Sequence, residues 1–254
     1  MAEHRPTAAI GIICKTPKAG ASKTRLLPLL GPARAAELAG CFLADIANGI
    51  DRLPVCVGHR GYAVYAPEGS EVELRRFVPP HFGLVCRRDA TLGIVLLGAT
   101  EYLLAEGHDV VVLVNADSPT LPTEFLQQAI AATRAPGDRV VLGPATDGGY
   151  YLIAMKRAHA HLFSAIPWST PDVLALTLKR AREIGLEVTL LPTWYDVDDA
   201  PSMRMLLDEL GGARLPFATT PTAAGPASAT HRFVVSHPDL AQRLANVTPS
   251  PAIA

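Results

Sequence analysis

Four cationic side chains lie within eleven residues near the N-terminus, namely Lys15, Lys18, Lys23 and Arg25. They directly follow the apolar run of residues 8–14, and Gly20 stands among them. A bound polyphosphate needs backbone amides for its oxygens and several cations for its charge, and such a loop supplies both. The GxxxxGK[ST] spacing of a Walker P-loop is absent. We predict a phosphate-binding loop of another kind, with a solvated basic turn as the alternative; its predicted binding residues are Lys15, Pro17, Lys18, Gly20, Lys23, Thr24 and Arg25.

Asp117 follows the clearest strand pattern of the chain, residues 109–114, and Ser118 and Pro119 break the pattern immediately afterwards. Mg²⁺ favours one or two carboxylates, with waters and phosphate oxygens completing its octahedron. We therefore predict that Asp117 is a ligand of Mg²⁺ or Mn²⁺. The alternative is that Asp117 caps a helix that begins near Pro122.

A second acidic group, Asp196, Asp198 and Asp199, lies near the end of a later strand pattern. Three acids in four residues repel one another unless solvent or a cation compensates their charge. The cluster is therefore a candidate source of a second metal ligand. Asp199 is also well placed to cap the helix that follows.

Two further segments are candidates for substrate contacts. Residues 147–150 place an acid and two glycines before a strand, although a tight turn would explain the glycines without any function. Residues 168–170 either contact substrate through Trp168 or only start a helix, with Thr170 as N-cap and Pro171 at the first helical position. The predicted substrate-binding residues are Asp147, Gly148, Gly149, Tyr150, Trp168, Ser169 and Thr170.

The elements that position these residues alternate between strand and helix patterns. A continuous apolar run such as residues 8–14 is typical of a strand buried on both faces. Alternation of this kind predicts an α/β fold with a mostly parallel sheet, whose ligands bind at the carboxyl ends of the strands. Expected strands are 8–14, 54–58, 62–66, 84–86, 109–114, 139–142, 150–155 and 187–191; expected helices are 32–50, 92–106, 122–133, 171–184 and 201–210.

Composition bounds the possible partners and the compartment. The 254 residues carry a formal net charge of −1, so the chain lacks the basic face that sequence-independent nucleic-acid binding requires. The four cysteines never approach CxxC spacing, which favours a reducing compartment. The apolar stretch 92–104 is too short to span a bilayer. We expect a soluble, cytoplasmic protein without nucleic-acid or membrane partners, and a homodimer is compatible with this interpretation.

The composition changes after Leu215, and residues 216–230 have the composition of a linker. Residues 1–212 are predicted to form the nucleotide-binding transferase domain, and residues 213–254 an Ala/Thr/Pro-rich linker and C-terminal tail. Within that tail, residues 231–247 recover some apolar character and could dock as a short strand and a helix. A chain that ends near Leu215 is expected to fold and to keep its nucleotide affinity.

The order of these motifs resembles one family. It is similar to the order in the GT-A-fold "transferase 1" family, which is associated with radical-SAM and selenoprotein-domain genes and is often labelled glycosyltransferase-like. The motifs that carry the resemblance are, in order, the basic loop, Asp117-Ser118-Pro119, residues 143–153, residues 168–170 and Asp196-Val197-Asp198. The resemblance covers about residues 10–210. More distantly, the set is similar to the molybdenum-cofactor and 2-phospholactate nucleotidyltransferases.

This resemblance implies a three-layer, nucleotide-diphospho-sugar-transferase-like fold with Asp117 as a metal ligand. By analogy with sugar nucleotidyltransferases it implies Asp198 as the second ligand, and we expect both acids at the carboxyl ends of neighbouring strands. The chain departs from the pattern at Ile94-Val95, where relatives usually carry Glu-Arg. The acceptor therefore differs from the usual one, or activity is reduced.

Three functions remain open at this stage. The first is metal-dependent nucleotidyl transfer, in which a phosphate or phosphonate oxygen of a small acceptor attacks the α-phosphorus of an NTP and pyrophosphate leaves. Lys23, Arg25 and Asp117 would be the catalytic residues, with Lys18 also neutralising the departing charge. The second is glycosyl transfer from a nucleotide-sugar, with Asp147 as base. The third is a non-catalytic nucleotide-binding module.

Overall fold

The protein is described by a computed structural model that covers residues 7–88, 91–218 and 224–246. The parts of the predicted transferase domain and tail at residues 1–6, 89–90, 219–223 and 247–254 lie outside the described residues, and so does Val247 of the predicted docking segment.

A seven-stranded sheet forms the middle layer, with the strand order β3-β2-β1-β4-β6-β5-β7. Every neighbouring pair is parallel except the two that involve β6, which runs antiparallel to β4 and to β5. The sequence prediction of a mostly parallel sheet is confirmed. The strands are β1 (Ala8–Lys15), β2 (His59–Ala66), β3 (Gly83–Cys86), β4 (Val110–Asn115), β5 (Arg139–Pro144), β6 (Tyr150–Met155) and β7 (Glu187–Leu190).

The central strands are apolar on both faces because each face is covered by helices. In β1, Ile10 and Ile12 enter one core cluster, whereas Ala9 packs into the other. In β4, Val112 enters the first cluster and Leu113 the second. Successive strand residues point to opposite faces, so an uninterrupted apolar run serves two cores at once.

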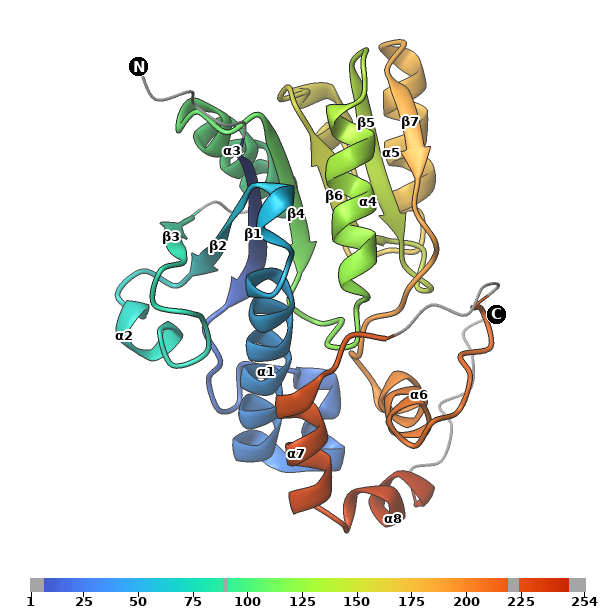
Figure 1. Cartoon of the computed structure of the whole chain (residues 1–254). Coiled ribbons are helices and arrows are strands. Elements are labelled where there is room, and N and C mark those ends of the chain that lie inside the picture. Colours follow the sequence, from blue (N-terminus) through green and yellow to red (C-terminus); the bar gives the residue numbers. More distant parts are fainter. Residues whose placement is uncertain (1–6, 89–90, 219–223, 247–254) are drawn as a thin grey trace.

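Helices form the two outer layers (Figure 1). α1 (Leu27–Asp51) and α4 (Thr123–Arg134) contribute to the first core cluster, and α3 (Leu92–Ala105) and α5 (Val173–Glu183) to the second. α6 (Ala200–Leu210) also packs into the first cluster through Met203 and Leu206. The three-layer α/β architecture agrees with the sequence prediction.

The structure differs locally from the sequence prediction at residues 54–58, at α2 and at the start of α1. The strand expected at 54–58 is a 3₁₀ turn, Val55–Val57, because none of the described strands pairs with this segment and Val55 is 93% exposed. A short helix, α2 (Glu71–Leu74), was not predicted. α1 begins at Leu27 instead of residue 32 and continues across Gly31, whose φ of 75° and ψ of 167° are not helical.

The segment Thr24–Asp51, which joins a 3₁₀ turn (Thr24–Leu26) to α1, is long and apolar enough to cross a membrane by length and composition alone. The core helix of a globular domain passes the same test. Here Leu38, Phe42 and Leu43 are buried in the first core cluster. Packing against the sheet therefore accounts for the apolar character of this segment.

The C-terminal segment is more integrated than the predicted linker and tail. Two helices, α7 (Ser228–Ser236) and α8 (Leu240–Ala245), replace the expected short strand and helix and pack against α1 and α6 (Figure 1). Phe233, Leu240 and Leu244 are buried there. Asp45 of α1 accepts hydrogen bonds from the backbone amides of Ala229 and Thr230, each at 2.8 Å.

Candidate active site

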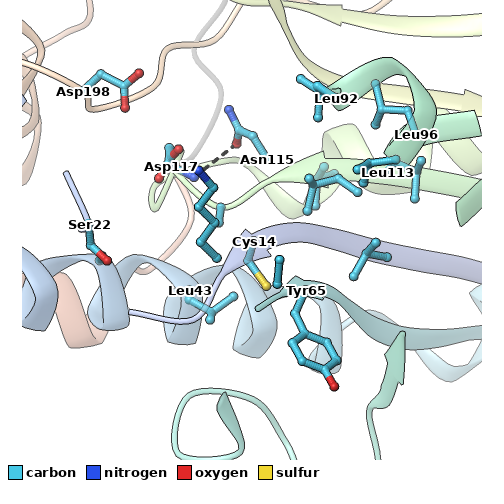
Figure 2. Close-up of a pocket in the computed structure, with 18 of the residues that line it drawn as sticks. Cys14, Ser22, Leu43, Tyr65, Leu92, Leu96, Leu113, Asn115, Asp117 and Asp198 are labelled. Atoms are coloured by element: carbon cyan, nitrogen blue, oxygen red, sulfur yellow. Dashed lines mark hydrogen bonds between the residues drawn. The ribbon is translucent and has the colours of Figure 1, made fainter. Parts of the chain in front are cut away.

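A cleft of about 750 Å³ lies at the carboxyl ends of β1, β2 and β4. The chain leaves β1 for β2 on one side, and β4 pairs with β1 on the other, so this is the point where the strand order reverses. Figure 2 shows Ser22, Asp117 and Asp198 toward one end of the cleft and Leu92, Leu96 and Leu113 toward the other. Apart from Cys14 and the tyrosines, the polar and charged lining residues are Lys15, Ser22, Lys23, Thr24, Arg25, Arg87, Thr91, Asn115, Asp117, Ser169 and Asp198.

Lys23 occupies the centre of the polar end. Its Nζ donates to Asp117 Oδ1 at 2.6 Å, to Asp198 Oδ1 at 2.9 Å and to the Val197 carbonyl at 2.7 Å. An ammonium has three N–H donors, so these contacts use all of them. Only 5% of the Lys23 side chain is exposed, against 40% for Asp117 and 41% for Asp198. Two predicted metal ligands and one predicted phosphate ligand thus form a single ion-pair cluster.

The electrostatics of this cluster keep the lysine charged. Burial alone would lower the pKa of Lys23, but Asp117 and Asp198 together, by charge and by hydrogen bonds, raise its pKa above the ordinary value. The Nζ also lies 5.2 Å from the centroid of the Phe42 ring. The two aspartates and the Val197 carbonyl therefore form a cation site that the Lys23 ammonium occupies.

Asp198 reaches the cluster by a route that the sequence prediction had wrong. It does not follow a strand next to β4, because the segment after β7 crosses back over the ends of β5 and β6. Backbone hydrogen bonds from Trp194 to the Pro144 carbonyl and from Val197 to the Asp117 carbonyl, at 3.0 and 2.9 Å, hold that segment. The Val197 bond is what brings Asp198 beside Asp117.

The other acids of this segment have different surroundings. Burial, followed by the charges of Asp147 and Asp198, raises the pKa of Asp196 to about 7. Asp199 caps α6: its Oδ1 accepts from the Ser202 amide, and the Ser202 hydroxyl completes a capping box. The capping role predicted for Asp199 is confirmed. Asp117 has no such role, since the residue that precedes α4 is Pro122 and no side chain caps that helix.

The basic loop divides into residues inside and outside the cleft. Lys15, Thr24 and Arg25 are exposed and line it, whereas Pro17, Lys18 and Gly20 do not. The Lys18 amide donates to Ser22 Oγ at 2.9 Å, which fixes the bend of the loop. The alternative of a solvated basic turn does not describe Lys23, because its contacts with the two aspartates bury its side chain.

Of residues 147–150, only Tyr150 lines the cleft. Asp147 Oδ1 accepts from the Gly149 amide at 2.8 Å, as in a tight turn. Gly148 has a φ of 91°, and a Cβ there would lie 2.2 Å from the Pro171 carbonyl oxygen, so the turn requires glycine. The structural explanation of these glycines is therefore sufficient, while the charge of Asp147 still reaches Asp196.

Of the predicted substrate contacts at residues 168–170, only one lies at the cleft. Ser169 lines the cleft. Trp168 packs against Gly93 at the start of α3 and lies edge-on to Tyr150, with ring centroids 6.4 Å apart. Thr170 donates to the Pro167 carbonyl and does not cap α5, whose N-cap position is Asp172.

Sequence reasoning missed several lining residues. Thr91 caps α3 by accepting from the Ile94 amide at 3.4 Å, and a threonine before an apolar helix pattern was the available signal. Arg87 lies against α3 at Gly98, where a Cβ would come within 2.1 Å of its guanidinium. No sequence pattern indicated Arg87 or the Val197 carbonyl, because both depend on tertiary packing.

The donor set suits a hard divalent cation. Asp117, Asp198 and the Val197 carbonyl all direct oxygen atoms at one positive centre. Within the described ranges, no group of three or more His, Cys, Asp or Glu side chains forms a metal site. Mg²⁺ needs only one or two carboxylates when substrate phosphates and waters complete its shell, so the residues present fit such an ion.

Comparisons with known proteins agree with this architecture. A family model described as an uncharacterized protein conserved in bacteria (DUF2064) matches residues 50–170, slightly less than half of the chain. The match includes Asp117 but neither Lys23 nor Asp198. None of the curated proteins compared with the chain matches it. The resemblance to the "transferase 1" family stays a prediction.

Solved structures show the fold. A crystal structure from Desulfovibrio desulfuricans G20, described as a candidate nucleotide-diphospho-sugar transferase, is 26% identical with a TM-score of 0.79, over 93% of this chain and 97% of that one. A CMP:2-keto-3-deoxy-manno-octonic acid synthetase complexed with CTP is 11% identical, with a TM-score of 0.53 over 81% and 99% of the two chains. A cytidylyltransferase from Leptospira borgpetersenii is 10% identical, with a TM-score of 0.52 over 97% and 100%. The protein has the nucleotide-diphospho-sugar-transferase-like fold.

Proposed function

We propose that the protein is a metal-dependent nucleotidyltransferase that joins the NMP part of an NTP to a small phosphorylated or phosphonate acceptor and releases pyrophosphate. The observation that carries the proposal is the cleft at the reversal of strand order, where exposed cations of one loop face the Asp117–Asp198 pair. The likeness to a nucleotide-diphospho-sugar-transferase fold supports it.

The positions of the loop cations support binding of a triphosphate. Lys15 and Arg25 are exposed and line the cleft beside Lys23, which sits between the acids. Cations and backbone amides fixed in advance stabilise the negative charge that develops on a leaving pyrophosphate. We assign Lys23 and Arg25 to that charge and Asp117 to the metal.

Asp117, Asp198 and the Val197 carbonyl would hold Mg²⁺ or Mn²⁺. When bound, the metal would polarise the phosphoryl oxygens. The chain's own groups orient the reactants: Arg25 and Lys15 bind phosphate oxygens, and the apolar wall of Leu92, Leu96 and Leu113 limits water at the other end of the cleft.

Product analysis tests this proposal. Each of the four NTPs is incubated with Mg²⁺ and a pool of phosphorylated metabolites, and pyrophosphate is measured. The proposal expects acceptor-dependent pyrophosphate with at least one NTP and none with Asp117→Asn. Release of a nucleoside diphosphate or of inorganic phosphate alone would contradict it.

A second candidate is glycosyl transfer from a nucleotide-sugar. It is favoured by the description of the structure with 26% identity as a candidate nucleotide-diphospho-sugar transferase. In this reaction Asp147 would be the base, yet its carboxylate accepts a hydrogen bond from Gly149 within a turn and does not line the cleft. Release of UDP or GDP from a nucleotide-sugar, with no pyrophosphate from any NTP, would select this alternative.

A further inference from the structure

The Lys23 side chain is bound more completely than an ordinary phosphate-binding lysine needs to be. Asp117, Asp198 and the Val197 carbonyl take all three ammonium donors, and only 5% of the side chain is exposed to solvent. Its backbone adopts the left-handed conformation, with φ 48° and ψ 50°. A residue other than glycine keeps that conformation only where its surroundings hold it. The lysine is therefore held in place by the acids.

The groups that bind Lys23, namely the Asp117 and Asp198 carboxylates and the Val197 carbonyl, are also those assigned to the metal. One oxygen of each carboxylate contacts Nζ, at 2.6 and 2.9 Å. A divalent ion held by these two carboxylates and the Val197 carbonyl would lie close to the ammonium, and the repulsion between the two positive charges opposes their joint occupancy. The site therefore has one place for a cation and two candidates for it.

We infer that Lys23 and a divalent cation are alternative occupants of the Asp117–Asp198 pair, and that a bound polyphosphate releases the pair by offering the Lys23 ammonium other oxygens. This inference rests on the proposed function for its polyphosphate step only. Lysine is suited to the exchange because its ammonium sits on a flexible four-carbon stem and can rotate between partners. Lys15 and Arg25, on the same loop, line the cleft into which it would turn.

The consequence is a linkage between two ligands. In the protein without nucleotide, Lys23 competes with metal, so metal binding is weak. A ligand that removes Lys23 raises metal affinity, and bound metal in turn raises affinity for that ligand by the same factor. The cleft thus favours metal after the phosphate chain has entered, and an empty cleft remains neutralised by its own lysine.

Binding of Mn²⁺ to the protein without nucleotide tests the competition directly. Free and bound Mn²⁺ are distinguished by electron paramagnetic resonance for the wild type, Lys23→Met and Lys23→Gln. We expect both variants to bind Mn²⁺ at least about tenfold more tightly than the wild type, which corresponds to about 1.4 kcal/mol of removed competition. Lys18→Met is the matched control: it removes the same charge from the same loop, but Lys18 does not line the cleft. Its affinity should stay at the wild-type value.

Equal Mn²⁺ affinity in the wild type and both Lys23 variants would overturn the inference, and so would an equal gain in Lys18→Met. No nucleotide, acceptor or turnover enters this measurement, so its result is independent of the reaction catalysed. If no NTP yields product but the Lys23 variants bind Mn²⁺ more tightly, the proposed function fails and the competition stands.

Thermal unfolding provides a second measurement and also reports whether the variants fold. In EDTA, Lys23→Met should melt at a lower temperature than the wild type, because it leaves two neighbouring carboxylates without their counter-ion. Lys23→Gln keeps N–H donors on a side chain one bond shorter than lysine and should lose less. Added Mg²⁺ should raise the melting temperature of Lys23→Met far more than that of the wild type. An equal Mg²⁺ shift in both proteins would contradict the inference.

Discussion

Replacement of Asp45 should weaken the attachment of the C-terminal helices to α1. Asp45 is 6% exposed, and its two carboxylate oxygens accept from the amides of Ala229 and Thr230, at 2.8 Å each. The residue before α7 is Ala227, which has no capping side chain, so Asp45 of α1 caps this helix from another part of the chain. Asp45→Asn keeps the shape but places an amide donor against a backbone donor.

The expected loss follows from those two hydrogen bonds. A hydrogen bond to a charged group contributes about 1.5–3 kcal/mol, and one of the two should be lost outright while the other weakens. We expect the free energy of unfolding to fall by about 2–4 kcal/mol in urea titrations. Hydrogen exchange at the Ala229 and Thr230 amides should accelerate by more than that of the central strands.

Asp208→Asn is the matched control, since Asp208 is exposed on α6. A surface change of this kind should stay within about 0.5 kcal/mol of the wild type. If Asp45→Asn is as stable as Asp208→Asn, the carboxylate cap contributes nothing and the reasoning about the C-terminal segment is refuted. In a chain ending at residue 218, Asp45→Asn should cost far less, because its partners are gone.

Three further predictions concern the basic loop, the C-terminal segment and the loss of stability at low pH. Arg25→Ala should weaken nucleotide binding by about 1.5–3 kcal/mol in calorimetry, whereas Lys179→Ala, on the exposed face of α5, should leave it unchanged; equal affinity of both variants would remove Arg25 from the site. A chain ending at residue 218 should lose about 5 kcal/mol or more of stability, from about 1.5–3 kcal/mol for each of Phe233, Leu240 and Leu244. It should keep its nucleotide affinity, because none of the described residues after 198 lines the cleft. An unchanged melting temperature would contradict the packing of the C-terminal helices. Arg34 and Arg243 lower the pKa of Asp239 from 3.8 to about 2, so its stabilising contribution is present above pH 4 and is lost as pH falls from about 4 to about 2. Asp239→Asn should reduce the dependence of the free energy of unfolding on pH in this range. If the pH dependence is unaltered, the ion pairs of Asp239 contribute nothing to stability.

The sequence predicted those features that local pattern determines. The apolar runs of β1 and β4 indicated strands buried on both faces, and Asp199 was correctly placed as a helix cap because its capping box lies within four residues. Asp117 and Asp198 were expected to meet, and they do through Lys23.

The rest depended on contacts between distant segments. The route of Asp198 is set by the backbone bond between Val197 and Asp117, eighty residues apart, and not by a neighbouring strand. Lys23 was read as one of four similar loop cations, and only the two acids distinguish it. The C-terminal helices were read as a tail because the partner that caps α7 lies on α1, 184 residues away in sequence.

Pyrophosphate formation by the aspartate variants tests the central claim most directly. With an NTP and acceptor that the wild type uses, Asp117→Asn and Asp198→Asn should each abolish Mg²⁺-dependent pyrophosphate release while remaining folded. The double variant should be scarcely worse than either single one, because residues that act as a unit are strongly non-additive. Independent, multiplicative losses, or full activity in EDTA, would contradict a single metal-dependent site formed by this pair.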